Sequence, residues 1–118
     1  MNFPRLARLT LKRDFSFVFE DPCKVSAGSF TILARRNELS HPRLGMAISK
    51  KNAKTAVSRN RIKRMVRESF RAHYEQLGDF DIVVLTRRGV MEQSKQQLSM
   101  SLEKQWNALV KRCAASLS

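Results

Sequence analysis

Near the start of the chain, apolar residues recur at the spacing of one helical face. Thr10 is a suitable N-cap for a helix over residues 11–19, and Asp21-Pro22 would end it because a residue before proline avoids the helical conformation. The apolar face of this helix consists of Leu11, Phe15, Val18 and Phe19. The pattern predicts a short helix that packs on the rest of the protein through one side.

Two extended patterns follow. Residues 29–37 and 43–50 have the pattern of strands, and the turn-forming segment 38–42 between them predicts that the two strands pair antiparallel. The pattern also allows one more short strand near Val25. In the second strand, large residues alternate with small ones, so that one face is bulky and the other nearly bare. The small residues are Gly45, Ala47 and Ser49.

The spacing becomes helical again in the second half of the chain. A helix is predicted from Ala56 or Ser58 to Leu77, and Gly78 would end it as a C′ glycine does. Its inward stripe is formed by Ile62, Met65, Val66, Phe70 and His73.

An almost continuous apolar run covers residues 80–86, which is typical of a strand that is covered on both faces and has a parallel neighbour. Ser94 opens a last helix that continues to about Cys113, with Gln97 at the capping-box position. The buried stripe of this helix is predicted to be Leu98, Leu102, Trp106, Leu109 and Cys113.

The element order is therefore helix, strand, strand, helix, strand, helix, with the additional strand near Val25 left open. This order predicts an α+β sandwich, a small mixed sheet of three to four strands packed with three helices. No repeat, low-complexity tract or linker divides the sequence, so residues 1–118 are predicted to form a single domain.

The charge of the chain indicates the kind of partner that the protein binds. The 118 residues include 23 Lys and Arg against 10 Asp and Glu, a formal charge of +13, while 42% apolar content argues against a disordered basic tail. No apolar run is long enough to span a bilayer. Since such an excess of charge opposes compaction, it indicates a polyanionic partner, either nucleic acid or an anionic membrane surface.

Most of the excess lies between Lys50 and Arg71, where nine Lys and Arg face the single acid Glu68. On the predicted helix, Arg59, Lys63 and Arg67 follow at i, i+4 and i+8, and like charges at this spacing weaken an isolated helix. A membrane-surface helix would need an exposed apolar face, but the core needs the only apolar stripe available. Nucleic acid is the favoured partner, and no membrane partner is expected.

Polar and aromatic residues beside this charge have two interpretations. Asn60 could bond a base or ribose, or bond its own backbone at the start of the helix. Three phenylalanines beside Lys12 and Arg13 could belong to the core, or one or two of the rings could stack on unpaired bases at the rim of a groove. These rings are Phe15, Phe17 and Phe19.

Cys23 and Cys113 have no partner at metal-ligand spacing, which argues against a zinc site. A disulfide between them is open but not favoured, and residues 1–11 lack the features of a signal peptide. The sequence therefore predicts free thiols in a reducing cytoplasm.

The basic segment also resembles the signature of a known family, the protein subunit of bacterial ribonuclease P. The Lys50-Lys51 pair is followed by Arg59-Asn60-Arg61 at the family's spacing. Agreement extends over essentially the whole chain, at Leu9-Thr10, Asp14-Phe15, Val18-Phe19, Arg43-Leu44-Gly45, Arg67-Glu68, Phe70 and Asp81-Ile82-Val83-Val84.

The resemblance implies a protein cofactor of an RNA enzyme that removes the 5′ leader from precursor tRNA. The RNA subunit and its Mg²⁺ ions would carry out the hydrolysis, so that catalytic residues, metal ligands and an organic cofactor are not expected in the protein. The partners implied are the ribonuclease P RNA and precursor tRNA, with no protein partner required. The resemblance also implies a left-handed βαβ crossover, whereas crossover connections between parallel strands are nearly always right-handed.

The resemblance also assigns residues to two surfaces. Contact with the catalytic RNA is expected from Arg59, Asn60, Arg61, Lys63, Arg64, Arg67 and Arg71. A cleft for the single-stranded leader, between the first helix and the sheet, is expected to contain Lys12, Arg13, Phe15, Phe19, Leu33, Ser49, Lys50 and Lys51. Leu33 stands where some relatives have an aromatic residue, which predicts weaker stacking at that position.

Other classes of function account for the sequence less well. A nuclease needs convergent carboxylates or a base, but the candidates have no metal-ligand spacing among them. They are Asp14, His41, Glu68, His73, Asp79 and Asp81. A ribosomal or general RNA-chaperone protein is the main alternative, whereas a DNA-binding helix-turn-helix lacks its short bracing helix.

Overall fold

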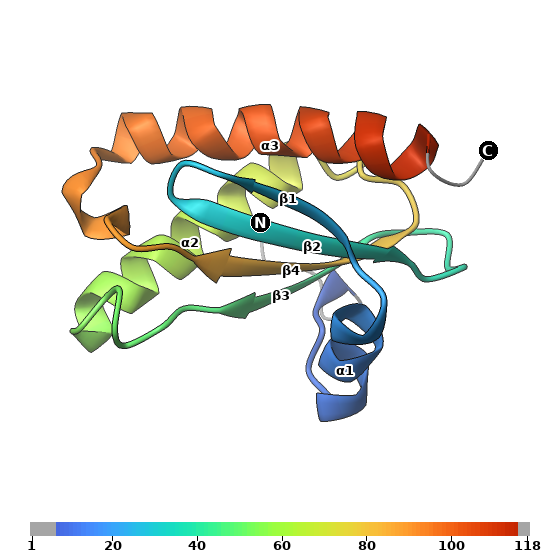
Figure 1. Cartoon of the computed structure of the whole chain (residues 1–118), viewed down its shortest axis with the longest axis horizontal. Helices are drawn as coiled ribbons and strands as arrows, with labels where there is room; N and C mark the ends of the chain where they lie inside the picture. The colour runs from blue at the N-terminus through green and yellow to red at the C-terminus, as the bar shows by residue number, and fades with distance from the viewer. Residues whose placement is uncertain (1–6, 116–118) are drawn as a thin grey trace.

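The computed structural model describes residues 7–115 (Figure 1). Six residues of the segment considered for a signal peptide, 1–6, lie outside the described part. The elements are α1 (Lys12–Glu20), β1 (Cys23–Ala27), β2 (Phe30–Arg36), β3 (Arg43–Ala47), α2 (Ala56–Ala72), β4 (Phe80–Thr86), the 3-10 helix η2 (Val90–Glu92) and α3 (Lys95–Ala115). Within this part of the chain, no helix has both the length and the apolar character needed to cross a membrane.

Strand β4 lies inside a four-stranded sheet whose order is β1-β2-β4-β3. It pairs antiparallel with β2 and parallel with β3. The predicted parallel neighbour of β4 and the additional strand near Val25 are thus confirmed, but the predicted antiparallel pairing of β2 with β3 is wrong. The most apolar strand takes the position between them, where both of its edges are paired and its residues 80–84 are buried. The left-handed crossover implied by the resemblance stays a prediction.

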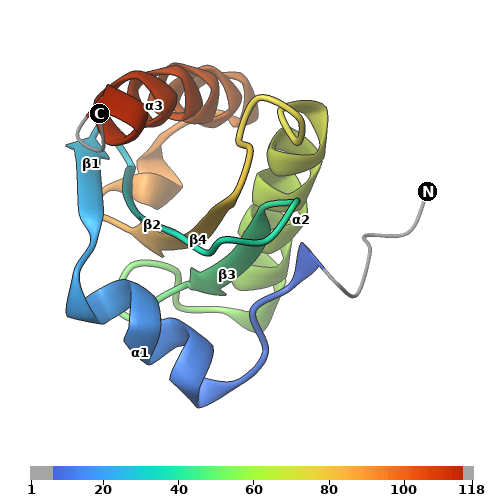
Figure 2. The ribbon, with the colours of Figure 1, turned by 90° about the vertical axis from the view of Figure 1, so that its right-hand side faces the viewer.

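The two faces of the sheet are covered unequally. Helices α2 and α3 bury one face, and α1 lies across the sheet from α3 (Figure 2). The main core includes Phe30 and Ile32 of β2, Ile82 and Val84 of β4, and Trp106 of α3. The core under α1 is much smaller, and its buried members are Leu9, Val18, Leu33 and Val83. The mixed α+β architecture with three helices agrees with the prediction.

Helix α1 begins one residue later than predicted. Leu11 rather than Thr10 is the N-cap, and the carboxylate of Asp14 accepts the Leu11 N–H at 3.4 Å. The C-cap is Asp21, as expected. Only Val18 of the predicted inward face is fully buried, whereas Leu11 and Phe19 are about half exposed, at 49% and 48%. The inward-face prediction is wrong for these two residues because a nine-residue helix meets only a narrow part of the sheet.

Helix α2 begins at Ala56, and the Thr55 hydroxyl caps it by accepting the Ser58 N–H at 3.0 Å. It ends at Ala72 rather than Leu77, and residues 73–79 form turns. Gly78 has the positive φ of a C′ glycine, +61°, but within this later turn. Four of the five predicted inward residues are buried, and His73 is only partly buried.

The predictions for α3 are confirmed. Ser94 and Gln97 form the capping box, with N–H to side-chain distances of 2.8 and 3.1 Å. The whole predicted stripe is buried. The Trp106 indole in this stripe donates to Ser69 of α2 at 2.7 Å, which joins the two helices.

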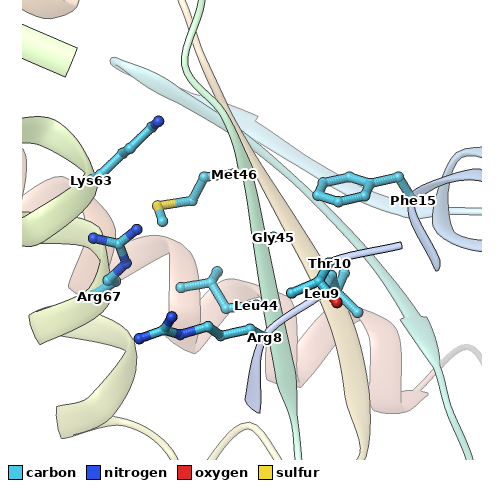
Figure 3. A pocket seen from close by; sticks show the side chains of 9 residues that line it. All are labelled: Arg8, Leu9, Thr10, Phe15, Leu44, Gly45, Met46, Lys63 and Arg67. Atoms are coloured by element: carbon cyan, nitrogen blue, oxygen red, sulfur yellow. The ribbon is translucent and has the colours of Figure 1, made fainter. Parts of the chain in front are cut away.

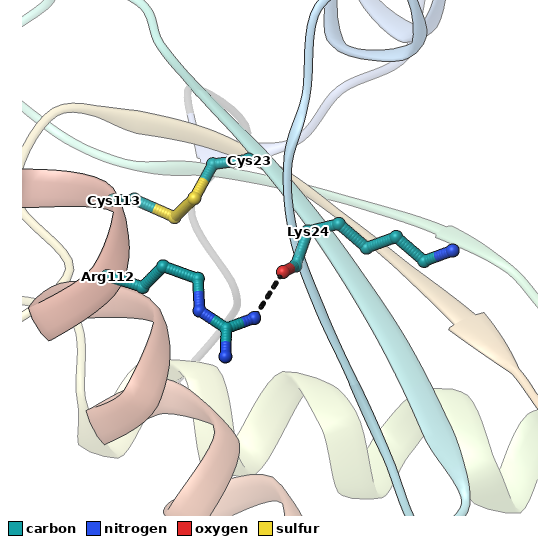
Figure 4. The surroundings of a disulfide bond; sticks show 4 residues. All are labelled: Cys23, Lys24, Arg112 and Cys113. Carbon is teal, nitrogen blue, oxygen red and sulfur yellow. Dashed lines mark hydrogen bonds between the residues drawn. A yellow bond between two sulfur atoms is a disulfide. The ribbon is translucent and has the colours of Figure 1, made fainter. Parts of the chain in front are cut away.

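Cys23 and Cys113 form a disulfide (Figure 4), so the expectation of free thiols is wrong. The edge strand β1 and the end of α3 lie side by side, which brings the two Cα atoms to 5.8 Å across 90 residues of sequence. Arg112 strengthens the junction by donating to the Lys24 carbonyl at 2.8 Å. Sequence spacing carries no information on so distant a contact.

We predict that reduction of this disulfide lowers thermal stability. A cross-link that closes a loop of this length stabilises by about 4 to 5 kcal/mol in the chain-entropy account, which corresponds to a fall of roughly 10 °C or more in Tm. Thermal unfolding followed with and without dithiothreitol measures the shift. The C23S/C113S double variant is the control and should be insensitive to the reductant. An equal Tm for the oxidised and reduced protein would contradict the prediction.

Candidate nucleic-acid interface

The basic residues of α2 lie on its outer side and at its edge next to β3, outside the buried stripe. Asn60, Arg61 and Arg64 are exposed, and Lys63, Arg67 and Arg71 are partly buried. Asn60 is not needed to start the helix, because Thr55 provides the cap. A hollow on this side is lined by Asn60, Arg64, Arg67, Glu68 and Arg71. Only one carboxylate thus faces three guanidinium groups, which suits a surface that binds phosphates.

Arg59 differs from the other basic residues of the set. Its guanidinium donates to the carbonyls of Ala53 and Lys54, both at 3.0 Å. These bonds hold the loop that precedes α2. The Lys50 and Lys51 side chains in that loop are exposed, and the Ser49 hydroxyl accepts the Lys51 N–H at 3.0 Å. Ser49 and Arg59 therefore shape the basic loop in addition to any contact they make with a ligand.

A second pocket crosses the outer edge of β3 and connects α2 with α1 (Figure 3). Lys63 and Arg67 reach it from α2, Arg8 from the segment before α1, and Phe15 from α1 itself. Its lining residues include three cations and no acid, the full set being Arg8, Leu9, Thr10, Phe15, Leu44, Gly45, Met46, Lys63 and Arg67. The two surfaces expected separately from the sequence thus meet in one pocket.

The electrostatics of this pocket favour an anion. Burial, and then the positive charge of Arg8, lower the pKa of Arg67. Both effects disfavour the charged form of a side chain that nevertheless remains protonated at neutral pH. A phosphate bound between these cations would offset the repulsion.

Phe15 rests directly on the backbone of β3. A Cβ atom added at Gly45 would lie 2.7 Å from the Phe15 ring and 3.1 Å from Leu9. The bare face of the strand is therefore occupied at Gly45 by a ring of the protein itself. Further along the strand, Ala47 is exposed and remains accessible.

Beyond α1, one row of the sheet is left uncovered. The strand register places Ser26, Thr31, Leu85 and Ala47 side by side across all four strands, on the face that carries α1. Ser26 and Ala47 are exposed, and Thr31 and Leu85 are partly buried. The Ser26 and Thr31 hydroxyls lie 3.0 Å apart. We call these four residues the open row.

The other residues expected in the leader cleft divide between surface and core. Lys12, Arg13 and Phe19 are exposed on α1, whereas Leu33 is only 7% exposed and packs in the small core beneath the helix. Phe17 is covered by the guanidinium of Arg35, 4.0 Å from the ring centre. Leu33 thus offers a ligand almost no surface.

Sequence reasoning missed several residues of this region. They are Arg8, Met46, Thr31 and Leu85, which the pocket and the open row bring together. Strand alternation alone does not show that Thr31 and Leu85 are neighbours on one face. That follows once the pairing of β4 with β2 is known. Arg8 lies beside β3 because its segment bridges Leu44, a contact with no periodic pattern.

Three of the carboxylates considered for catalysis have structural partners, and one of them is Asp79, which pairs with Arg36 at 2.8 Å. Asp81 is 1% exposed and accepts two hydrogen bonds from Arg43, at 2.8 and 2.7 Å, and one from Asn37 at 2.8 Å. The hydrogen bonds to Asp81 raise the pKa of Arg43. Asp14 caps the start of α1. Among residues 7–115, no group of three or more His, Cys, Asp and Glu side chains is arranged to hold a metal ion.

A basic helix, a cation-lined pocket and a partly open sheet face together are typical of a nucleic-acid-binding protein, here of α+β architecture. The comparisons with known proteins specify it further. The chain belongs to the ribonuclease P protein family, whose model, described as Ribonuclease P, matches residues 3–110.

Relatives and solved structures agree with this assignment. The ribonuclease P protein component of Methylococcus capsulatus is 50% identical over 116 residues, covering 98% of this chain and 91% of the relative. That of Proteus mirabilis is 52% identical over 104 residues, covering 88% and 87%. The structure of the Staphylococcus aureus RNase P protein matches with a TM-score of 0.81 at 32% identity, covering 86% of this chain and 94% of that one. The RNase P protein from Thermotoga maritima matches with a TM-score of 0.73 at 33% identity, covering 89% and 96%.

We predict that Asp81→Asn lowers the free energy of unfolding by about 2 to 3 kcal/mol, because it leaves the charge of Arg43 without its buried partner. Urea denaturation measures the change. Asp79→Asn is the control, since it breaks the more exposed pair with Arg36 and should cost less than about 0.5 kcal/mol. Equal losses in the two variants would contradict a special role for Asp81.

Proposed function

We propose that this protein is the protein component of a bacterial ribonuclease P. In this proposal it is a single RNA-binding domain that holds the catalytic RNA on α2 and the 5′ leader of precursor tRNA beside α1. Family membership supports the proposal, and the observation that carries it is the pocket that joins Lys63 and Arg67 to Phe15. The pocket gives two RNA segments adjacent places on one molecule.

The proposed contact with the catalytic RNA rests on the outer side of α2. Arg61 and Arg64 are exposed, and arginine matches the geometry of phosphate oxygens with two parallel hydrogen bonds. The exposed Asn60 amide directly precedes Arg61 in sequence and can both donate to and accept from a base or ribose. Helix α2 therefore supplies charge for affinity and one neutral group for local discrimination.

The proposed leader site is the open row together with the rim of α1. A single strand needs a surface for its bases and cations for its phosphates. Leu85 and Ala47 supply apolar surface, Phe15 and Phe19 supply rings, and α1, α2 and the loop after β3 supply five exposed or partly buried cations. These cations are Lys12, Arg13, Lys50, Lys51 and Lys63.

The protein is part of an endoribonuclease holoenzyme. In the proposed division of work, the RNA subunit and its Mg²⁺ ions hydrolyse the phosphodiester bond, and the protein binds and orients the leader. The side chains described above bind phosphate and sugar without activating a nucleophile. The proposed location is the bacterial cytoplasm, where precursor tRNA is made.

The proposed contact with the catalytic RNA can be tested on α2. Arg64→Ala should weaken binding to ribonuclease P RNA and reduce the slope of log affinity against log salt by about 1, because one phosphate contact is lost. Binding titrations at several salt concentrations measure both quantities. Lys104→Ala removes the same charge from the exposed side of α3 and should change neither. An unchanged affinity for Arg64→Ala would remove it from the interface.

The proposed leader site can be tested on α1. Phe19→Ala removes a half-exposed ring and should weaken binding of leader-bearing precursor tRNA by about 1 to 3 kcal/mol if the ring stacks on a base, with mature tRNA unaffected. Phe15→Ala should act in the same direction but also disturb the contact with Gly45. Affinities of the reconstituted holoenzyme for both RNAs test this. Equal losses for precursor and mature tRNA would place the rings outside the leader site.

A further inference from the structure

Helix α1 has a weak hold on the sheet, although the proposed leader site depends on its position. It is nine residues long, and Val18 is its only fully buried residue. A helix this short is not stable alone and relies on tertiary contacts. Polar contacts must therefore contribute to holding it in place.

Two arginines from the sheet hold α1 near its two ends. Arg35 of β2 donates to the Phe17 carbonyl at 2.8 Å and lies 4.0 Å from Glu20. Arg43 of β3 lies 3.6 Å from the carboxylate of Asp14 in the first turn. The strand register places these two arginines on either side of Asp81. The buried carboxylate thus lies in the middle of a charged row beneath the helix.

Arg43 is the better fixed of the two arginines. Both of its hydrogen bonds to Asp81 are short, and Asn37 holds the same carboxylate. The Nη2 atom that bonds Asp81 is also the atom nearest to Asp14, so one nitrogen lies between two carboxylates. Asp14 therefore meets a positive charge whose place is set by the sheet. The next residue along the helix is Phe15, whose ring rests on Gly45.

We propose that Arg43 is a positioning residue for the RNA-binding pocket. Fixed by Asp81, it holds the first turn of α1 through Asp14 and so sets where Phe15 stands at the edge of β3. The effect on RNA rests on the proposed leader site, whereas the effect on α1 does not.

The test begins with Asp14→Asn in the full chain, because asparagine keeps an oxygen for the Leu11 N–H but removes the charge that faces Arg43. Loss of a partly exposed ion pair should speed amide hydrogen exchange over residues 12–20 by about two- to fivefold. In the reconstituted holoenzyme, the extra affinity that a leader confers should fall by a similar factor. The cleavage rate at saturating substrate and the affinity for ribonuclease P RNA should stay unchanged.

Two further variants separate positioning from general stability. Asp79→Asn makes the same charge change in the Arg36 pair, which does not touch α1, and should alter neither the exchange over 12–20 nor the leader effect. Arg43→Lys keeps the charge, but an ammonium group cannot reproduce the two-nitrogen contact with Asp81 that fixes the guanidinium beside Asp14. It should therefore reproduce the effect of Asp14→Asn, and the double variant should lose no more than either single one.

The outcomes are distinct. Faster exchange over α1 together with a smaller leader effect, in both variants and with Asp79→Asn unchanged, supports the proposal. Unchanged exchange in Asp14→Asn overturns it. Faster exchange with the leader effect intact shows that Arg43 holds the helix but does not position the pocket. If the wild-type protein itself shows no leader effect, the proposed leader site is wrong, and the exchange result alone then decides the role of Arg43 in holding α1.

Discussion

The unequal covering of the two faces of the sheet is the constraint on which the rest of the structure depends. Strand β4 lies between β2 and β3 and carries apolar residues on both of its faces, so both faces need cover. Two long helices bury most of one face, whereas among the described residues the other face is covered by the nine-residue helix α1 and by Leu9 just before it. One row of that face therefore remains open, next to a helix that carries aromatic rings and cations. The candidate leader site is a consequence of this imbalance.

The distribution of charge follows the same unequal covering of the two faces of the sheet. The stripe of α2 that faces the sheet is apolar, so its basic residues lie on the outer side and at the edge next to β3, where a bound phosphate would offset the repulsion among them. Acidic groups near α1 are instead bound within the protein, Asp81 by Arg43 and Asp14 at the start of the helix. These carboxylates thus have partners within the fold, and the lining of the pocket between α1 and α2 contains three cations and no acid.

Local patterns in the sequence predict what depends on local structure. The capping box of Ser94 and Gln97 and the stripe from Leu98 to Cys113 follow from helical spacing alone, and the structure confirms both. Strand partners depend on contacts between distant segments, so the chain neighbours β2 and β3 were expected to pair when β4 in fact separates them. The Cys23–Cys113 disulfide and the place of Arg8 in the pocket are distant contacts of the same kind. The basic residues of the candidate site were predictable from charge, but the open row was not.

The most direct test of the account is cleavage of precursor tRNA by a bacterial ribonuclease P RNA at low, near-physiological Mg²⁺, with and without this protein, over a series of leader lengths. The account predicts that the protein accelerates cleavage, that the acceleration grows as the leader becomes long enough to lie along the open row and then levels off, and that the protein alone cleaves nothing. Acceleration that is independent of leader length, or no acceleration by a protein that binds another RNA tightly, would contradict it.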